Sequence, residues 1–322
     1  MKSLQRPLAW ILLLALIFAF GCSDIHRCVH ADEPDVLAQE KAELWKKLLA
    51  ARPSPALRSE KPALTVAVLD VGQGDCILLI APDGKTMLVD AGPVGSFDTI
   101  RTALAAQNVT SLDVVVATHP HADHIGSMAG VLDSYAVDTY VTIPQQQTDM
   151  LYMRVQNMVS DNGCTVIYPT GGQTIEWSDA CTVTVLNPIA GYPDPEELND
   201  ASIVLHVQYG DTAVLLAGDA EELAEKRMLD TFPRSMLRAD VLKLGHHGSS
   251  SSTGYSFFLA VSPDYAVASC GADNEYGHPH LDTLSLLYDT RTALYRTDYD
   301  GTITFYLDGT DVSVETTRKE LP

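Results

Sequence analysis

The segment Thr118-His119-Pro120-His121-Ala122-Asp123-His124 places three imidazoles and one carboxylate within six positions. It directly follows an apolar run, residues 114–117, that predicts a β-strand. Packing alone seldom gathers such side chains, because buried His and Asp each need a partner. Imidazole and carboxylate are ligand types that suit zinc, manganese or iron. The pattern therefore favours a metal site over the alternative, a solvated loop rich in histidine.

Rigid strand ends must aim these side chains at one point. We predict β-strands at residues 65–70, 76–80, 86–89, 203–208, 213–216, 241–244, 265–269, 303–307 and 312–315. Helices are predicted at residues 97–107, 221–232, 255–260 and 282–290. Because helices separate strands in both halves of the chain, we expect two sheets packed face to face with helices outside.

The HxHxDH pattern of residues 119–124 resembles the metallo-β-lactamase superfamily. Five further segments, in the expected order, resemble the extracellular hydrolase domain of ComEC-type DNA-uptake proteins and their stand-alone relatives. They are Leu69-Asp70-Val71-Gly72-Gln73-Gly74-Asp75, Val89-Asp90-Ala91-Gly92, Ala217-Gly218-Asp219, Gly245-His246-His247-Gly248-Ser249 and Tyr276-Gly277-His278-Pro279. The resemblance covers about residues 63–318 and implies an αββα sandwich, with two mixed β-sheets and helices on the outer faces.

The resemblance also implies a ligand set for one or two divalent ions, zinc or manganese. It assigns His119 and His121 to one metal, and it assigns Asp123, His124 and His247 to the second, with Asp219 bridging both. Asp90 would orient ligands, as carboxylates do for metal-bound histidines. Two metals about 3.5–4 Å apart can activate a hydroxide and stabilise a leaving oxygen. Asp123 is accordingly expected to take part in catalysis as well as in metal binding.

The chain departs from the superfamily just ahead of the strand that leads to the bridging aspartate. Relatives usually carry a further metal-binding His there, where this chain has Asn199 and Ser202. We therefore expect the first metal to be weaker, replaced by water, or absent, with Asn199 near ligand or substrate. His206, inside the following strand, is interpreted as a core or surface residue rather than a ligand.

Three further polar residues have weaker indications. By resemblance, His278 is expected to reach a substrate phosphate or to protonate a leaving group, whereas His280 is interpreted as a plain surface residue. Ser249, beside His247, is expected to donate a hydrogen bond to an oxyanion. A flexible solvated loop explains the run of serines at 249–252 nearly as well.

The N-terminus has the features of a signal segment. Lys2 and Arg6 precede an apolar run, residues 8–20, which ends at Gly21 and Cys22. The run is short for a membrane span, which needs about 20 residues. Residues 19–22 resemble a bacterial lipobox, so we predict lipidation at Cys22; an ordinary signal peptide and an uncleaved anchor are the alternatives. All three place the remaining chain outside the cytoplasm.

We therefore divide the chain into a signal segment (1–22), a helical stalk with a Pro-rich linker (23–62) and a hydrolase domain (63–318). The helical pattern runs from Asp32 to Arg52. Alternatively, this helix docks on the domain through its leucine face.

The net charge and the cysteine spacing further restrict the possible functions. The net charge of -21 repels polyanions, although a bound divalent ion can still attract a phosphate. The cysteines after Cys22 show no CxxC spacing, which argues against a cysteine zinc site. Cys164 and Cys181 either pair across neighbouring strands or are two buried thiols.

Together these features predict a secreted, membrane-anchored, metal-dependent hydrolase. The favoured activity is that of a phosphodiesterase or nuclease acting through metal-bound hydroxide, and nucleic acid is the substrate implied by the resemblance alone. The alternatives are an amide or ester hydrolase that opens β-lactams or lactones, and a catalytically silent surface binding module. The expected partners are a phosphodiester substrate and, through the lipid anchor, the membrane; the sequence predicts no protein partner.

Overall fold

The computed structural model describes residues 33–53, 58–144, 147–190 and 198–318. The chain forms two compact units, 1–46 and 47–322. What the structure describes of the first unit is the start of helix α3 (Glu33–Ala50), which lies where the sequence pattern predicts a helix. Among the helices in these ranges, none has the length and apolarity to cross a bilayer. The predicted signal segment and Cys22 lie outside the described residues.

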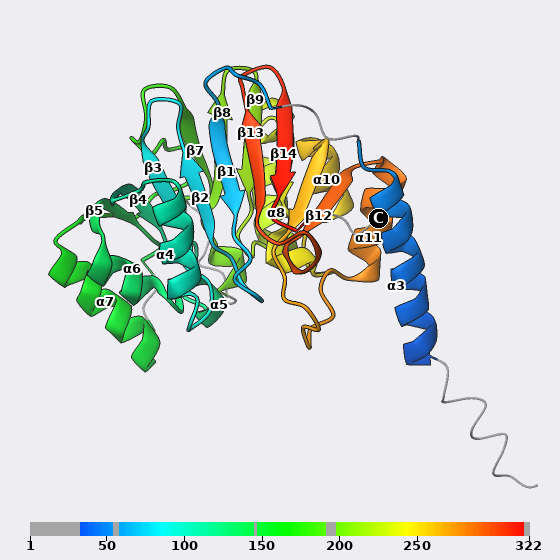
Figure 1. Ribbon diagram of the computed structural model, residues 1–322, viewed down its shortest axis with the longest axis horizontal. Coiled ribbons are helices and arrows are strands. Elements are labelled where there is room, and N and C mark those ends of the chain that lie inside the picture. Colours follow the sequence, from blue (N-terminus) through cyan, green and yellow to red (C-terminus); the bar gives the residue numbers. More distant parts are fainter. Residues whose placement is uncertain (1–32, 54–57, 145–146, 191–197, 319–322) are drawn as a thin grey trace, which may run out of the picture. The chain divides into compact units, whose positions relative to one another are not determined.

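The second unit contains two mixed β-sheets (Figure 1). The first sheet has the order β14-β13-β1-β2-β3-β4-β5-β6 and the second has the order β12-β11-β10-β9-β8-β7. The strands of the first sheet are β1 Leu64–Val68, β2 Ile77–Ile80, β3 Thr86–Val89, β4 Ser111–Val116, β5 Ala136–Val141, β6 Thr165–Ile167, β13 Ile303–Leu307 and β14 Val312–Thr316. Those of the second are β7 Thr182–Asn187, β8 Val204–Tyr209, β9 Thr212–Leu216, β10 Val241–Lys243, β11 Tyr265–Ala268 and β12 Ala293–Arg296.

Helices join these strands and cover the sheets. They are α4 Phe97–Ala106, α5 Ala122–Ile125, α6 Met128–Ser134, α7 Met150–Asn162, α8 Glu222–Thr231, α9 Arg234–Leu237, α10 Tyr255–Val261, α11 Leu281–Thr290 and α12 Thr297–Asp300. Two short 3₁₀ helices, η1 Asn199–Ala201 and η2 Gly245–Gly248, lie between strands of the second half. The predicted αββα class is confirmed.

The alternating direction of side chains along the strands explains how the sheets and helices form layers. Val66, Leu205 and Phe305 belong to one buried cluster drawn from both sheets. Leu88, on the opposite face of the first sheet, belongs to a second cluster with Ile100 of α4 and residues of α6 and α7. Successive strand residues point to opposite faces, so the first sheet packs on the second sheet with one face and on helices with the other.

The last turn of α3 begins the second unit. Leu48 is buried there, and the Arg52 guanidinium donates two hydrogen bonds to Asp300, at 2.7 and 2.8 Å, and one to Leu294 O at 2.8 Å. The segment 47–52 is thus bonded to residues near the C-terminus. The predicted division between a linker and a domain at residue 63 stays a prediction.

The alternative of a Cys164–Cys181 disulfide is wrong. Both residues are free thiols, Cys181 buried and Cys164 partly so. Cys164 directly precedes β6 at the edge of the first sheet, whereas Cys181 precedes β7 at the edge of the second sheet. The two strands are not neighbours, so the cross-strand geometry that the sequence suggested does not exist.

Candidate metal centre

The predicted ligands come from the carboxyl ends of parallel strands in both sheets. Asp90 follows β3 and the HxHxDH segment follows β4, its parallel neighbour in the first sheet. In the second sheet, Asp219 follows β9 and His247 follows β10, which is parallel to β9. Because parallel strands end at the same edge of a sheet, each sheet presents two of these segments at one edge. Contacts of Asp219 with His124 and of His247 with Asp123 bring the two edges together.

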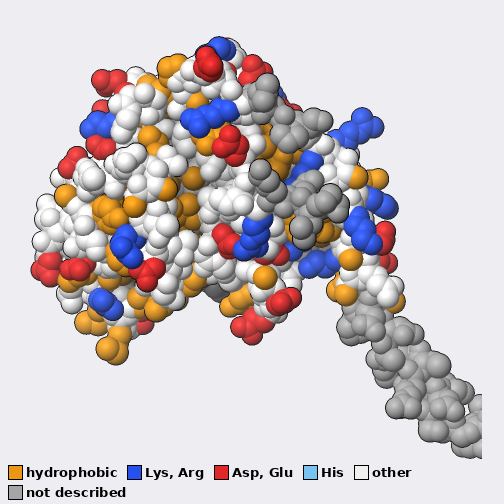
Figure 2. Space-filling model, viewed as in Figure 1, with side chains coloured by type: hydrophobic (Ala, Val, Ile, Leu, Met, Phe, Trp, Pro, Cys, Tyr) orange, Lys and Arg blue, Asp and Glu red, His pale blue; other side chains and the backbone are white. Residues whose placement is uncertain are grey.

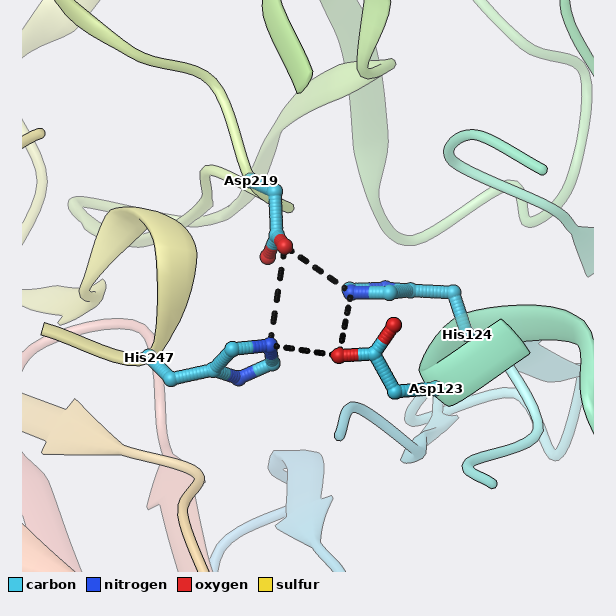
Figure 3. A group of neighbouring side chains, drawn as sticks. All are labelled: Asp123, His124, Asp219 and His247. Atoms are coloured by element: carbon cyan, nitrogen blue, oxygen red, sulfur yellow. Dashed lines mark hydrogen bonds and ion pairs between the residues drawn. The ribbon is translucent and has the colours of Figure 1, made fainter. Parts of the chain in front are cut away.

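Four side chains form the tightest group. Asp123, His124, Asp219 and His247 each direct one ligand atom inward, and these atoms lie within 4.8 Å of one another (Figure 3). His124 Nε2 and His247 Nε2 lie 3.2 and 3.5 Å from Asp219 Oδ2, and His247 Nε2 lies 3.2 Å from Asp123 Oδ2. Tetrahedral ligands with metal bonds of 2.0–2.1 Å are about 3.4 Å apart. The spacing therefore suits one metal ion.

Hydrogen bonds fix both imidazoles so that Nε2 faces the centre. His124 Nδ1 donates to Asp90 Oδ2 at 2.7 Å, and His247 Nδ1 donates to Ser269 O at 2.8 Å. Asp90 is itself held by Thr118, whose N and Oγ1 donate to its carboxylate at 2.8 and 2.7 Å. This is the outer layer of contacts that orients metal-binding histidines, and Asp90 lies where the sequence predicts a second-layer carboxylate.

The electrostatics also fit a cation. Burial acts to raise the pKa of the Asp219 carboxyl, but the His124 and His247 rings hold that pKa well below its usual range. Burial conversely acts to lower the pKa of His124, yet Asp219 and Asp90 raise it well above the ordinary value. Among the described residues, Asp219 Oδ1 is buried without a hydrogen-bond partner, and His124 Nε2 lies 3.2 Å from the Asp219 carboxylate. A divalent ion would bind the ligand atoms of such a buried, polar cluster and satisfy those that lack a partner.

The two residues assigned to the first metal lie beside this group. His119 Nε2 is 2.9 Å from His121 Nδ1 and 3.8 Å from Asp219 Oδ2. Burial, together with the neighbouring His124 ring, lowers the pKa of His119 well below its usual value, so its ring is neutral and suited to metal binding. Asp219 is the carboxylate that faces both sets of imidazoles.

The backbone is strained where it presents His246 and His247. Their φ angles are 44° and 56°, in the left-handed region that non-glycine residues rarely adopt. A glycine is required at Gly74, because a Cβ there would lie 2.2 Å from Asp123 O. The loop before Asp75 can thus lie directly against the Asp123 backbone, where Asp75 N donates to Asp123 O at 3.2 Å.

The remaining predicted residues lie at different distances from the centre. The His278 ring is buried 6.0 Å from the His247 ring, and burial with the nearby His247 and His246 rings lowers its pKa to about 3. The Ser249 hydroxyl is bonded to Ser251 Oγ at 2.8 Å rather than directed at the ligands. Asn199 Nδ2 donates to Glu221 Oε1 at 3.2 Å.

Two histidines lie away from the ligands. His206 is buried and its Nε2 donates to Arg238 O at 2.8 Å, so of the two interpretations left open, core or surface residue, the structure has the first. His280 is partly exposed; its Nδ1 accepts from Ser250 N and its Nε2 donates to Tyr276 O, each at 2.9 Å. It connects two loops, which the sequence could not reveal.

Two pairs of interacting polar side chains were not predicted from the sequence. Glu221 Oε1 accepts from His246 Nδ1 at 2.7 Å, so the His246 Nε2 atom faces the centre, 3.9 Å from Asp219 Oδ2. Lys243 and Asp75 form a fully buried ion pair of 2.7 Å beneath the ligands. A lone lysine inside the apolar run Val241-Leu242-Lys243-Leu244 was the available signal for the second pair.

Comparisons with known proteins agree with this geometry. A family model described as the metallo-β-lactamase superfamily matches residues 69–145. The ComE operon protein 3 of Bacillus subtilis is 31% identical over 268 residues, 78% of this chain and 34% of that protein. Competence protein ComA of Neisseria gonorrhoeae is 30% identical over 282 residues, 85% of this chain and 37% of that protein. The chain thus spans about a third of the length of these relatives.

A solved structure shares the fold. A mutant of the β-hydroxylase CmlA aligns with a TM-score of 0.50 and 14% sequence identity, covering 78% of this chain and 55% of that one. Identity this low supports the architecture alone. The function must therefore be argued from the site.

Proposed function

The chain belongs to the metallo-β-lactamase superfamily, with homologues among ComEC-like competence proteins, and from this premise we propose that it is a phosphodiesterase acting on nucleic acid. The observation that carries the proposal is the convergence of Asp123, His124, Asp219 and His247 on one point, where Asp219 Oδ1 is buried without a hydrogen-bond partner. A metal-dependent hydrolase is what the superfamily and this cluster support. The phosphodiester substrate rests on the resemblance to the hydrolase domain of DNA-uptake proteins and on the relative named competence protein ComA.

The ligand set divides into two positions that share Asp219. Asp123, His124 and His247 would hold one ion, and His119 with His121 would hold another, zinc or manganese by the ligand types. Bound ions of this kind activate water and neutralise charge on a phosphoryl group. Around them, Glu221 holds the His246 ring with its Nε2 atom toward the centre. His278 lies further out, with Nδ1 3.5 Å from Gln73 Nε2.

A metal and substrate panel tests the proposal. Purified protein, analysed for bound metal, would be assayed with bis(p-nitrophenyl) phosphate, single-stranded DNA, a β-lactam, a lactone and a simple ester. We expect metal-dependent hydrolysis of both phosphodiesters and none of the acyl substrates. Turnover of the β-lactam or the lactone alone would replace the proposal with the amide or ester alternative, and no turnover of any substrate would favour the silent binding module.

We expect His278→Ala to lower phosphodiester turnover about 10²-fold, the lower end of what a positioned side chain contributes. Because the His278 pKa is depressed, its ring acts as a neutral hydrogen-bonding group beside the substrate. Metal content and melting temperature should stay close to those of the wild type. A structural role predicts the reverse, namely a lower melting temperature with activity per folded molecule preserved. Loss of one metal equivalent would instead make His278 a ligand.

We also propose that the protein acts outside the cytoplasm, attached to the membrane through lipid on Cys22. The support is the short apolar run that ends at Gly21 and Cys22. Cys22→Ser should leave the precursor unprocessed or release the protein into the medium, as read by mass spectrometry of the membrane and soluble fractions. A mature N-terminus at another residue without lipid would contradict this proposal.

A further inference from the structure

The loop between β11 and α11 presents an aromatic ring beside the metal centre. Tyr276 is 61% exposed, and its ring lies parallel to that of buried His278, with 5.6 Å between centroids and 18° between planes. His278 in turn lies 5.4 Å from the His246 ring and 6.0 Å from that of the ligand His247. The rings form a series that runs from the metal ligands outward and ends at Tyr276.

Hydrogen bonds hold this loop in place. Asn274 Nδ2 donates to Gly271 O and to His278 O, both at 2.9 Å, and Asn274 Oδ1 accepts from His278 N at 2.8 Å. Tyr276 O accepts from His280, which is itself bonded to Ser250. The exposed ring therefore sits on a preorganised support, so little loop entropy is lost when a ligand packs on it.

We propose that Tyr276, backed by His278, is a stacking subsite for a nucleobase of a single-stranded substrate; this inference rests on the proposed function. A parallel aromatic pair with one exposed face accepts another planar ring, and stacking of a base on such a face adds to the binding energy. Bases within a duplex already have both faces covered. The subsite therefore selects unpaired nucleotides next to the cleaved bond.

The charge of the protein explains why such a subsite is needed. Most nucleic-acid binding comes from Lys and Arg contacts to phosphates, whereas this chain carries a net charge of -21. On the face seen in Figure 2, described Lys and Arg side chains are interspersed with Asp and Glu rather than gathered into a basic track. Stacking supplies binding energy that does not depend on positive charge, and the metal centre supplies the local attraction for one phosphate.

The test compares two strands of equal charge. Hexathymidylate and its abasic counterpart, both with hydrolysis-resistant phosphorothioate linkages, are titrated onto metal-loaded protein and followed by fluorescence anisotropy. We expect the wild type to prefer the strand with bases, and Tyr276→Ala to weaken that strand about 10-fold while leaving the abasic strand unchanged. Tyr276→Trp should retain the preference. Tyr168→Ala, at an exposed tyrosine after β6, is the matched control and should change neither affinity.

Salt provides an independent check, because stacking is not screened. Both affinities should fall between about 50 and 200 mM salt, but the ratio between them should stay constant, because the two strands carry the same phosphates. Equal affinities for the two strands, equal losses in Tyr276→Ala, or no binding of either strand would each overturn the subsite. Failure of the proposed function would give a different result. The wild-type protein would then fail to hydrolyse the same two strands, with or without bases, when they are made with ordinary phosphodiester linkages.

Discussion

Replacing Asp219 with alanine should remove metal from both positions and abolish hydrolysis. Asp219 Oδ2 lies 3.2 Å from His124 Nε2, 3.5 Å from His247 Nε2 and 3.8 Å from His119 Nε2, so this one oxygen faces imidazoles of both proposed positions. Turnover should fall by about 10⁴-fold or more, the scale reached when a catalytic unit is dismantled. Plasma emission spectroscopy of dialysed protein measures the metal.

Two controls make the result specific. Asp211→Ala makes the same chemical change at an exposed position in the turn between β8 and β9, and it should alter neither metal content nor turnover. His121→Ala should cost one metal equivalent, because His121 is assigned to the first position with His119, whose Nε2 lies 2.9 Å from His121 Nδ1. Full metal content in the folded Asp219→Ala protein would show that the carboxylate is not a bridge.

The candidate site could be predicted where a residue type that binds metal directly follows a predicted strand. The HxHxDH segment after an apolar strand, Asp219 after β9 and His247 after β10 are local signals, and the structure brings all of them together. The His246–Glu221 contact was not predictable, because the two residues are 25 positions apart and meet only once β9 and β10 pair. Glu221, at the start of a predicted helix, could equally well be interpreted as a solvent-exposed residue.

The fold was predictable where burial leaves a clear pattern. The central strands β8, β9 and β10 are almost wholly buried, so their apolar runs stand out. Residues 122–190 contain several elements whose bounds were not predicted, among them β6 (Thr165–Ile167), for which only a strand near Cys164 was suggested. This edge strand has three residues, none of them buried, so it carries little of the periodicity on which strand prediction depends.

The buried Lys243–Asp75 pair leads to the second large expected effect. Lys243→Met should reduce the free energy of unfolding by about 3–5 kcal/mol, because it leaves the Asp75 carboxylate charged, buried and without its cation. Urea denaturation measures the loss. Lys226→Met, at an exposed position of α8, is the matched control and should change stability by less than about 0.5 kcal/mol.

The double variant Asp75→Asn/Lys243→Met separates stability from metal binding. With both charges removed, most of the lost stability should return, since replacing a buried pair by neutral groups is often nearly neutral. Metal affinity should not return. Asp75 Oδ1 lies 3.4 Å from His247 Nδ1, and losing the charge of such an outer carboxylate typically weakens metal binding about 10- to 100-fold. A refolded double variant with wild-type metal affinity would show that the pair serves folding alone.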